Sequence, residues 1–148
     1  MGTRRALRVL VVDDCQDQVT TLALLLKLWG HQALVASDGP TALDTALAHR
    51  PDVAVLDLGL PGCMDGFEVA RRLRASPPTA KTLLVALTGY GQEADRRRAA
   101  EAGFDHYFVK PSEPEQLKNL LDGYASLAQD GAMAGPPGGT TSDVLRLP

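Results

Sequence analysis

The sequence has few cysteines, no long apolar run and no excess of positive charge. Its 148 residues include two cysteines, Cys15 and Cys63, which are too few for a disulfide framework and lie at no metal-ligand spacing. No apolar run approaches the roughly 18 residues that a membrane-spanning helix needs. The formal net charge of -3 gives no reason to expect nucleic acid as a partner, because phosphate-backbone binding depends on a basic surface.

The remaining composition is that of an ordinary globular domain. The hydrophobic share of 45% and the charged share of 22% match such domains, and the length suffices for one core. No signal-peptide pattern is present, so we expect a cytoplasmic protein with no membrane partner. We predict a leader over residues 1–6, one folded domain over residues 7–128 and a flexible Gly/Pro-rich tail over residues 129–148.

A short aliphatic run over residues 53–56 is closed by Asp57 and by a Gly/Pro turn over residues 59–62. This pattern is typical of a strand that is buried on both faces of a parallel sheet. The carboxyl ends of such strands form the ligand crevice of an open α/β sheet, so we expect Asp57 at that crevice. An aspartate also commonly begins a turn, and this residue taken alone leaves both interpretations open.

Strand and helix patterns alternate along the whole chain up to the tail. The predicted strands cover residues 6–12, 31–36, 53–57, 82–87 and 105–109, and the predicted helices cover residues 16–29, 40–49, 65–74 and 92–102, with a last helix beginning near Ser112. Gly30, Asp38 and Asp65 are the expected capping residues. This order predicts a doubly wound, five-stranded parallel sheet flanked by five helices, a flavodoxin-like (βα)5 fold.

The predicted helix over residues 92–102 differs from the others because alanine fills its inward positions. The expected inward residues are Ala94, Ala99 and Ala102, and the basic residues between them are Arg96, Arg97 and Arg98. Alanine buries little area, so this helix should dock weakly and move easily, as a switch would. The alternative is an Ala-rich surface helix with a solvated basic face.

Polar residues follow four of the predicted strands at one edge of the sheet: Asp13 with Asp14, then Asp57, Thr88 and Lys110. Three close carboxylates repel one another unless a cation lies among them, and carboxylate oxygens suit Mg²⁺. Lys110 would pair with Asp57 and then bind an anion, to which the Thr88 hydroxyl adds a hydrogen bond. The combination indicates a phosphoryl site, since aspartate is a known covalent phosphoryl acceptor.

The motifs at residues 11–14, 55–61, 64–66, 86–89 and 107–111 closely resemble the receiver domain of two-component response regulators. The resemblance covers residues 7–127 and is strongest to single-domain regulators and to receivers of hybrid sensor kinases. It implies that Asp57 accepts a phosphoryl group from a histidine kinase or a histidine phosphotransfer protein. It also implies Mg²⁺ bound by Asp14, Asp57 and the Gly59 carbonyl, with Asp13 assisting through water.

The same resemblance implies a conformational switch. Thr88 and Lys110 would contact the phosphoryl oxygens, Thr88 would move toward them, and Tyr107 would turn inward. A cis peptide is expected before Pro111. The surface offered to a downstream protein partner would be the fourth helix, fifth strand and fifth helix, with Arg96, Arg97 and Arg98 as candidate contacts.

Other functions remain open at this stage. A magnesium-dependent aspartyl-phosphate phosphatase usually has a second aspartate two residues after the nucleophile, where this sequence has Gly59. A flavin or nucleotide carrier would need a phosphate-binding loop where Asp13 and Asp14 stand. A pseudo-receiver that acts by binding alone is a further alternative. Cys15 and Cys63 depart from the family pattern. The most that we expect from either of them is a thiol near the pocket. We expect a signalling module and not a conventional enzyme.

Overall fold

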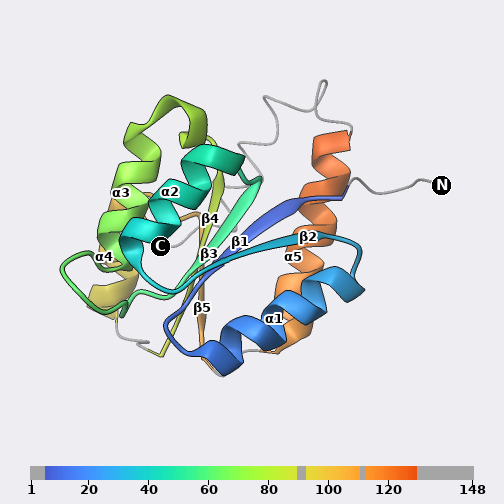
Figure 1. Ribbon diagram of the computed structural model, residues 1–148, viewed down its shortest axis with the longest axis horizontal. Helices are drawn as coiled ribbons and strands as arrows, with labels where there is room; N and C mark the ends of the chain where they lie inside the picture. The colour runs from blue at the N-terminus through green and yellow to red at the C-terminus, as the bar shows by residue number, and fades with distance from the viewer. Residues whose placement is uncertain (1–5, 90–92, 111–112, 130–148) are drawn as a thin grey trace.

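Five parallel strands form a central sheet in the order β2-β1-β3-β4-β5, with helices on both faces (Figure 1). The computed structural model describes residues 6–89, 93–110 and 113–129. The strands are β1 (Arg8–Val12), β2 (Gln32–Ala36), β3 (Val53–Leu56), β4 (Leu83–Thr88) and β5 (His106–Val109). The helices are α1 (Gln16–Leu28), α2 (Gly39–His49), α3 (Gly66–Ala75), α4 (Glu93–Ala102) and α5 (Pro114–Gln129), with a short 3-10 turn, η1 (Pro77–Thr79). The predicted fold is confirmed.

The core has two layers, one on each face of the sheet. Alternate residues of β1 and β3 point to opposite faces, and all of them except Arg8 are buried. Val9, Val11, Val53 and Val55 pack with residues of α1 and α5, whereas Leu10, Val12, Ala54 and Leu56 pack with residues of α2, α3 and α4. The uninterrupted aliphatic runs in the sequence therefore reflect burial on both faces, as in other parallel sheets.

The register of the sheet aligns the carboxyl ends of its central strands. Val12 of β1 lies level with Leu56 of β3, so the residues that follow these two strands emerge side by side. Backbone hydrogen bonds continue beyond the strands, since the Asp57 N–H donates to the Val12 carbonyl at 2.9 Å. The chain order reverses between β1 and β3, which is the topological switch point where open α/β sheets bind ligands.

Capping residues end and begin the helices where the sequence predicted. Gly30 follows α1 with a φ of +93°, a left-handed conformation that favours glycine. The carboxylates of Asp38 and Asp65 accept the backbone N–H groups of Thr41 and Glu68 at 2.8 and 3.0 Å, and so cap α2 and α3. The predicted start of the last helix near Ser112 lies outside the described residues.

Helix α4 buries less than the sequence predicted. Ala99 and Ala102 are buried, but Ala94 is exposed, so its predicted inward position is wrong. Ala94 precedes Ala99 by five residues, which places it about 140° around the helix from Ala99. In the part of the chain that the structure describes, no helix is long and apolar enough to cross a membrane.

Candidate functional site

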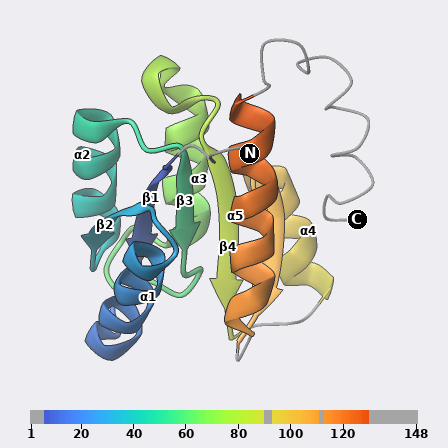
Figure 2. The ribbon, with the colours of Figure 1, turned by 90° about the vertical axis from the view of Figure 1, so that its right-hand side faces the viewer.

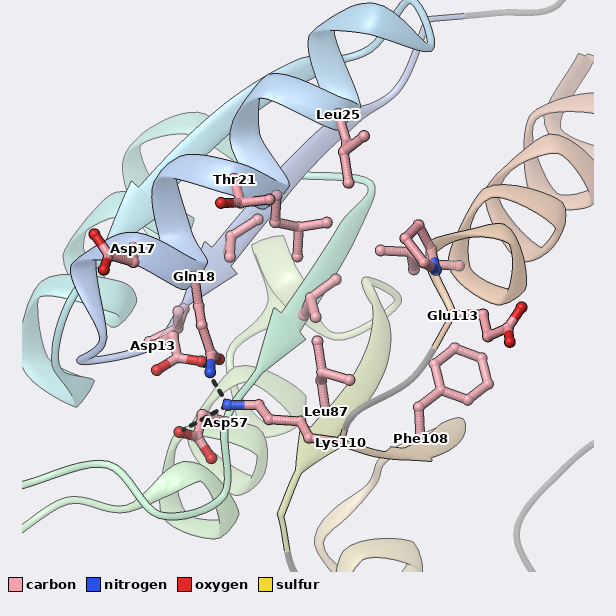
Figure 3. A pocket seen from close by; sticks show the side chains of 16 residues that line it. Asp13, Asp17, Gln18, Thr21, Leu25, Asp57, Leu87, Phe108, Lys110 and Glu113 are labelled. Carbon is pink, nitrogen blue, oxygen red and sulfur yellow. Dashed lines mark hydrogen bonds and ion pairs between the residues drawn. The ribbon is translucent and has the colours of Figure 1, made fainter.

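Three carboxylates meet at the carboxyl ends of β1 and β3. Asp13 and Asp14 directly follow β1, and Asp57 directly follows β3. One oxygen from each lies within 4.8 Å of the others, and Asp13 is buried whereas Asp14 is exposed. The sequence placed these three acids at one sheet edge, and the structure brings them together. Figure 3 shows two of them, Asp13 and Asp57, side by side.

Lys110 enters the same cluster from the end of β5. Its Nζ donates to Asp13 Oδ2 at 2.8 Å and lies 3.6 Å from Asp57 Oδ2 (Figure 3). The predicted pairing with Asp57 is present, but the shorter contact is with Asp13. Its backbone N–H donates to the Thr88 carbonyl, which ties the ends of β4 and β5 together.

Asp13 and Asp57 are held in the same way. The Oδ1 atom of each accepts the backbone N–H of the residue two positions later, from Cys15 at 2.9 Å and from Gly59 at 3.1 Å. The Oδ2 atom of each faces the Lys110 ammonium group. Asp side chains commonly bond the backbone two residues on, so Asp57 has both of the roles that the sequence left open: it begins a turn and it lies at the ligand crevice.

The environment shifts the pKa values of the central pair. Burial raises the pKa of Asp57, and the charges of Asp13 and Asp14 raise it further, against the lowering effects of the Gly59 N–H and of Lys110. Burial lowers the pKa of Lys110, but the hydrogen bond to Asp13 and the charge of Asp57 outweigh it and leave that pKa raised. Lys110 is therefore a cation at neutral pH. The Asp57 carboxylate is partly removed from water, and this desolvation disfavours its charged form.

Gly66 allows α3 to begin close against the site. A Cβ atom at this position would collide with the carbonyl oxygen of Asp57 and with the Cα of Leu58. The Gly66 N–H donates to the Leu58 carbonyl at 3.1 Å, which fixes the turn between β3 and α3. The sequence contained Gly66 in a motif, but the reason for glycine there emerges only from this close approach.

Thr88 and Tyr107 lie on the neighbouring strands β4 and β5. Thr88 is the last residue of β4 and is fully buried, and Tyr107 in β5 is also buried. The Arg96 guanidinium lies 4.7 Å from the centre of the Tyr107 ring. Burial raises the pKa of the Tyr107 phenol, the Asp95 charge raises it further, and Arg96 opposes both. Tyr107 thus links α4 to β5.

The three arginines of α4 do not share one surface. Arg98 lies 4.0 Å from the centre of the Phe67 ring of α3, and Arg97 makes an exposed 3.9 Å pair with Glu93. Two of the three, Arg96 and Arg98, are therefore engaged with aromatic rings, a geometry in which a cation is attracted to the ring face.

Pro111, with its expected cis peptide, lies outside the described residues.

The donor set at the acidic cluster fits Mg²⁺. Carboxylate oxygens are the hard ligands that this ion prefers, and it commonly binds through one or two carboxylates while keeping waters. The closest ligand oxygens of Asp13, Asp14 and Asp57 converge from two adjacent loops. Such a cation would relieve the mutual repulsion of three acids that Lys110 offsets only in part.

The fold and this site define a class of protein. Residues 9–122 match the response regulator receiver domain family, and the chain belongs to that family. Receiver domains are modules of two-component phosphorylation signalling and not conventional enzymes, and the acidic cluster is typical of their phosphoacceptor site.

Known relatives include short and long proteins. The chain is 36% identical over 124 residues to an uncharacterized 14.6 kDa protein of Leptolyngbya boryana, covering 84% of this chain and 94% of that one. It is 32% identical over 115 residues to PilH of Pseudomonas aeruginosa, covering 78% and 94%. It is 37% identical over 110 residues to PleD of Caulobacter vibrioides, where the match covers 74% of this chain but spans only about a quarter of PleD (24%).

Solved structures of similar proteins agree with this assignment. Chemotaxis protein CheY4 of Vibrio cholerae is 29% identical with a TM-score of 0.74, and the match covers 79% of this chain and 97% of that one. The receiver domain of sensor histidine kinase PA1611 of Pseudomonas aeruginosa is 26% identical with a TM-score of 0.75, covering 82% and 99%. That receiver was solved with a magnesium ion coordinated in its active site cleft.

Proposed function

We propose that this chain accepts a phosphoryl group on Asp57, with Mg²⁺, from a phosphohistidine of a histidine kinase or of a histidine phosphotransfer protein. The observation that carries the proposal is the convergence of Asp13, Asp14 and Asp57 with Lys110 at the switch point of the sheet. We assign Asp57 as the nucleophile because it directly follows the central strand β3 and its carboxylate faces both Lys110 and the other two acids.

The transfer needs positioning and charge neutralisation more than covalent chemistry by the protein. A carboxylate oxygen of Asp57 attacks phosphorus, the P–N bond to the donor imidazole breaks with its electron pair going to that ring, and an acyl phosphate forms. The Gly59 N–H holds Oδ1 and thereby orients the carboxylate. Bound Mg²⁺, held by Asp13, Asp14, Asp57 and the Gly59 carbonyl, would neutralise the phosphoryl oxygens.

Two further groups would contact the phosphoryl oxygens once they arrive. Lys110 Nζ already lies between Asp13 and Asp57, so a small movement transfers its contact from a carboxylate to the new anion. The Thr88 hydroxyl, on the adjacent strand, would supply a hydrogen bond. Phosphorylation adds roughly two negative charges and strong acceptor oxygens, which is sufficient to reposition both side chains.

The output would be a change in the surface formed by α4, β5 and α5. Helix α4 buries alanines against the core, and Arg96 connects it to Tyr107 of β5. A shift of Thr88 toward the phosphoryl group and a rearrangement of Tyr107 would therefore be passed to α4. Arg96, Arg97 and Arg98 are the candidate contacts for a downstream protein partner.

The test is the intact mass of the protein after incubation with acetyl phosphate, a small phosphodonor, in Mg²⁺ or in chelator. Wild type should gain one phosphoryl group only when Mg²⁺ is present, and Asp57→Asn should gain none. Asp44→Asn, which removes an exposed acid from α2, is the matched control and should behave as wild type.

The same experiment separates the alternatives. No addition under any condition would favour a pseudo-receiver that acts by binding alone, provided that the protein is folded. Rapid turnover of many phosphodonor molecules would favour a phosphatase, although Gly59 provides no carboxyl group where such enzymes have their general acid. Addition that survives in Asp57→Asn would place the acceptor at another residue.

A further inference from the structure

Large hydrophobic side chains that remain exposed lie at one edge of the sheet. Over the described residues they belong to three consecutive elements: Leu24 and Leu28 of α1, Val35 of β2 and Leu47 of α2. Figure 2 shows α1, β2 and α2 together on one side of the molecule and α4 on the opposite side. The exposed apolar surface is therefore at the β2 edge, across the sheet from the surface of α4, β5 and α5.

The backbone of β2 has hydrogen-bonding groups that face away from the sheet. In the described part of the chain, β2 pairs with β1 alone. The Gln32 N–H and the Ala36 carbonyl bond the residues that directly precede and follow β1. Because the direction of these groups alternates along a strand, the N–H and C=O groups of Ala33 and Val35 point outward. They are the donors and acceptors of the open edge.

The sequence of β2 contains no feature that blocks pairing along this edge. The strand reads Gln-Ala-Leu-Val-Ala, without a charged residue or a proline. Lysine, proline and bulges are common means of keeping an exposed edge from pairing with another chain. The Val35 side chain is 49% exposed, so no described element covers the edge at this point. Strand β2 can therefore accept another strand.

The open edge is complementary to a second copy of itself. In an antiparallel arrangement with Leu34 opposite Leu34 of the second copy, Ala33 of each copy pairs with Val35 of the other. These pairs use all of the outward N–H and C=O groups, and a two-fold axis relates the copies. We propose that two copies of this chain associate through β2 in this register, so that one sheet continues through both.

The exposed side chains fit this arrangement on both faces of the sheet. Leu34 and Leu43 are partly buried in the core layer that includes α2, and Leu47 lies one turn after Leu43. The two-fold axis brings these leucines together with those of the second copy. On the α1 face, Val35 lies opposite Ala33 of the second copy. The association therefore buries apolar surface on each side of the joined strands.

The charges near the edge are complementary under the same symmetry. Those of α1, of α2 and of the two residues that flank α2 are Asp17, Lys27, Asp38, Asp44, His49 and Arg50. In each helix the acids precede the basic residues. The axis reverses the helices of the second copy, so the basic end of each helix lies nearest the acidic part of its counterpart. A parallel arrangement would place like charges together.

The association should be weak and independent of phosphorylation. The interface consists of one strand and the sides of two helices, which is less than permanent dimers usually bury. We therefore expect a dimer whose population depends on protein concentration. The β5 edges lie at the two outer ends of the joined sheet, so the surface of α4, β5 and α5 stays accessible in both copies.

Sedimentation equilibrium of the full chain over a micromolar to millimolar concentration series tests the association. The average mass should rise from the 15.7 kDa of one chain toward twice that value. Val35→Lys places a charge on the open edge without touching the core, and should hold the mass at that of one chain throughout the series. Circular dichroism would show that the variant is folded.

Leu28→Lys is the matched control because it makes the same kind of change on α1. Leu28 follows Thr21 by seven residues, or about two turns, and Thr21 lines the cavity between α1 and α5. Leu28 therefore faces away from β2, and this variant should associate as wild type does. Association that survives Val35→Lys but is lost in Leu28→Lys would place the contact on α1 and overturn the proposal.

Cysteine cross-linking tests the register, in a background of Cys15→Ser and Cys63→Ser. Leu34→Cys brings two thiols together at the axis and should give a cross-linked dimer on mild oxidation. Gln32→Cys, on the same face of the same strand, places the two thiols about 14 Å apart and should not cross-link. A chain that stays monomeric at every concentration, or equal cross-linking of both variants, would overturn the proposal.

Discussion

Two clusters of partly buried charge lie at opposite edges of the sheet and are organised differently. At the carboxyl edge, Lys110 faces Asp13 and Asp57, with Asp14 close by. At the other edge, Arg74 of α3 pairs with Asp105 at 2.7 Å, one cation with one anion. The first cluster carries excess negative charge, whereas the second is balanced.

The balanced cluster is also saturated with hydrogen bonds. The Arg74 guanidinium donates to the carbonyls of Ala80, Thr82 and Gly103 as well as to Asp105, whose Oδ2 also accepts the Leu84 N–H at 2.9 Å. Such a network ties α3, β4 and the start of β5 together. The comparison teaches that local charge balance, more than burial, separates a structural ion pair from a reactive one.

The largest effect is expected at the balanced cluster. Arg74→Ala should lower the free energy of unfolding by about 3 kcal/mol, because it leaves Asp105 and several carbonyls without their donor. Urea unfolding followed by circular dichroism measures this change. Arg71→Ala, on the same helix but exposed, should shift stability by less than about 0.5 kcal/mol. Equal effects of the two variants would mean that the network contributes little.

Removing an acid should change the free energy of unfolding in opposite directions in the two clusters. Asp105→Asn should lower the free energy of unfolding by about 2 kcal/mol, because a charged hydrogen bond to Arg74 is lost. Asp57→Asn should raise it by up to about 1 kcal/mol in chelator, because one of three repelling charges disappears. Urea unfolding of both variants in the same buffer decides this, and destabilisation of similar size in both would contradict the distinction.

Removal of the cation at the carboxyl edge should be rescued by metal. Lys110→Met leaves three acids without their ammonium partner and should cost about 1 kcal/mol in chelator. Adding Mg²⁺ should recover this loss, because a bound ion stabilises the folded state by mass action. Thermal unfolding with and without Mg²⁺ measures it. The same addition should not rescue Arg74→Ala, and rescue of both would show a nonspecific salt effect.

The smallest effect is expected where paired charges are exposed to solvent. Glu68 pairs with Arg72 and Arg71 on the surface of α3, and these hydrogen bonds lower its pKa below the ordinary 4.5. Because the pKa is lower in the folded state, the stabilisation is present above 4.5 and disappears as the pH falls through the lowered value. Glu68→Gln should therefore be slightly less stable than wild type at neutral pH and equal to it in acid, as urea midpoints across pH would show.

The sequence predicted the functional cluster better than the structural one. Alternating strands and helices require a parallel sheet, and parallel strands bring their carboxyl ends to one edge, so Asp13, Asp57 and Lys110 could be placed together without coordinates. Arg74 and Asp105 are 31 positions apart and carry no pattern, so their pairing emerges only because the end of α3 lies close to the residue that precedes β5. Connectivity therefore predicts where elements end, but not which side chains meet across layers.

Individual side-chain contacts could not be predicted from the sequence for the same reason. The shorter contact of Lys110 with Asp13 depends on the path of its side chain across the sheet edge. The stacking of Arg96 and Arg98 on aromatic rings required the rings of β5 and α3, which come from distant segments. The domain limits, the roles of the site residues and the cis peptide before Pro111 stay predictions.

The matching anchors of Asp13 and Asp57 carry a consequence for variation and engineering of the family. Because each carboxylate is fixed by a main-chain N–H two positions later, residues 15 and 59 contribute to the site without using their side chains. A thiol at Cys15 and a bare Cα at Gly59 are thus compatible with the same acid geometry. Side chains there can be exchanged while the backbone anchors stay in place, whereas proline at either position would remove the anchor itself.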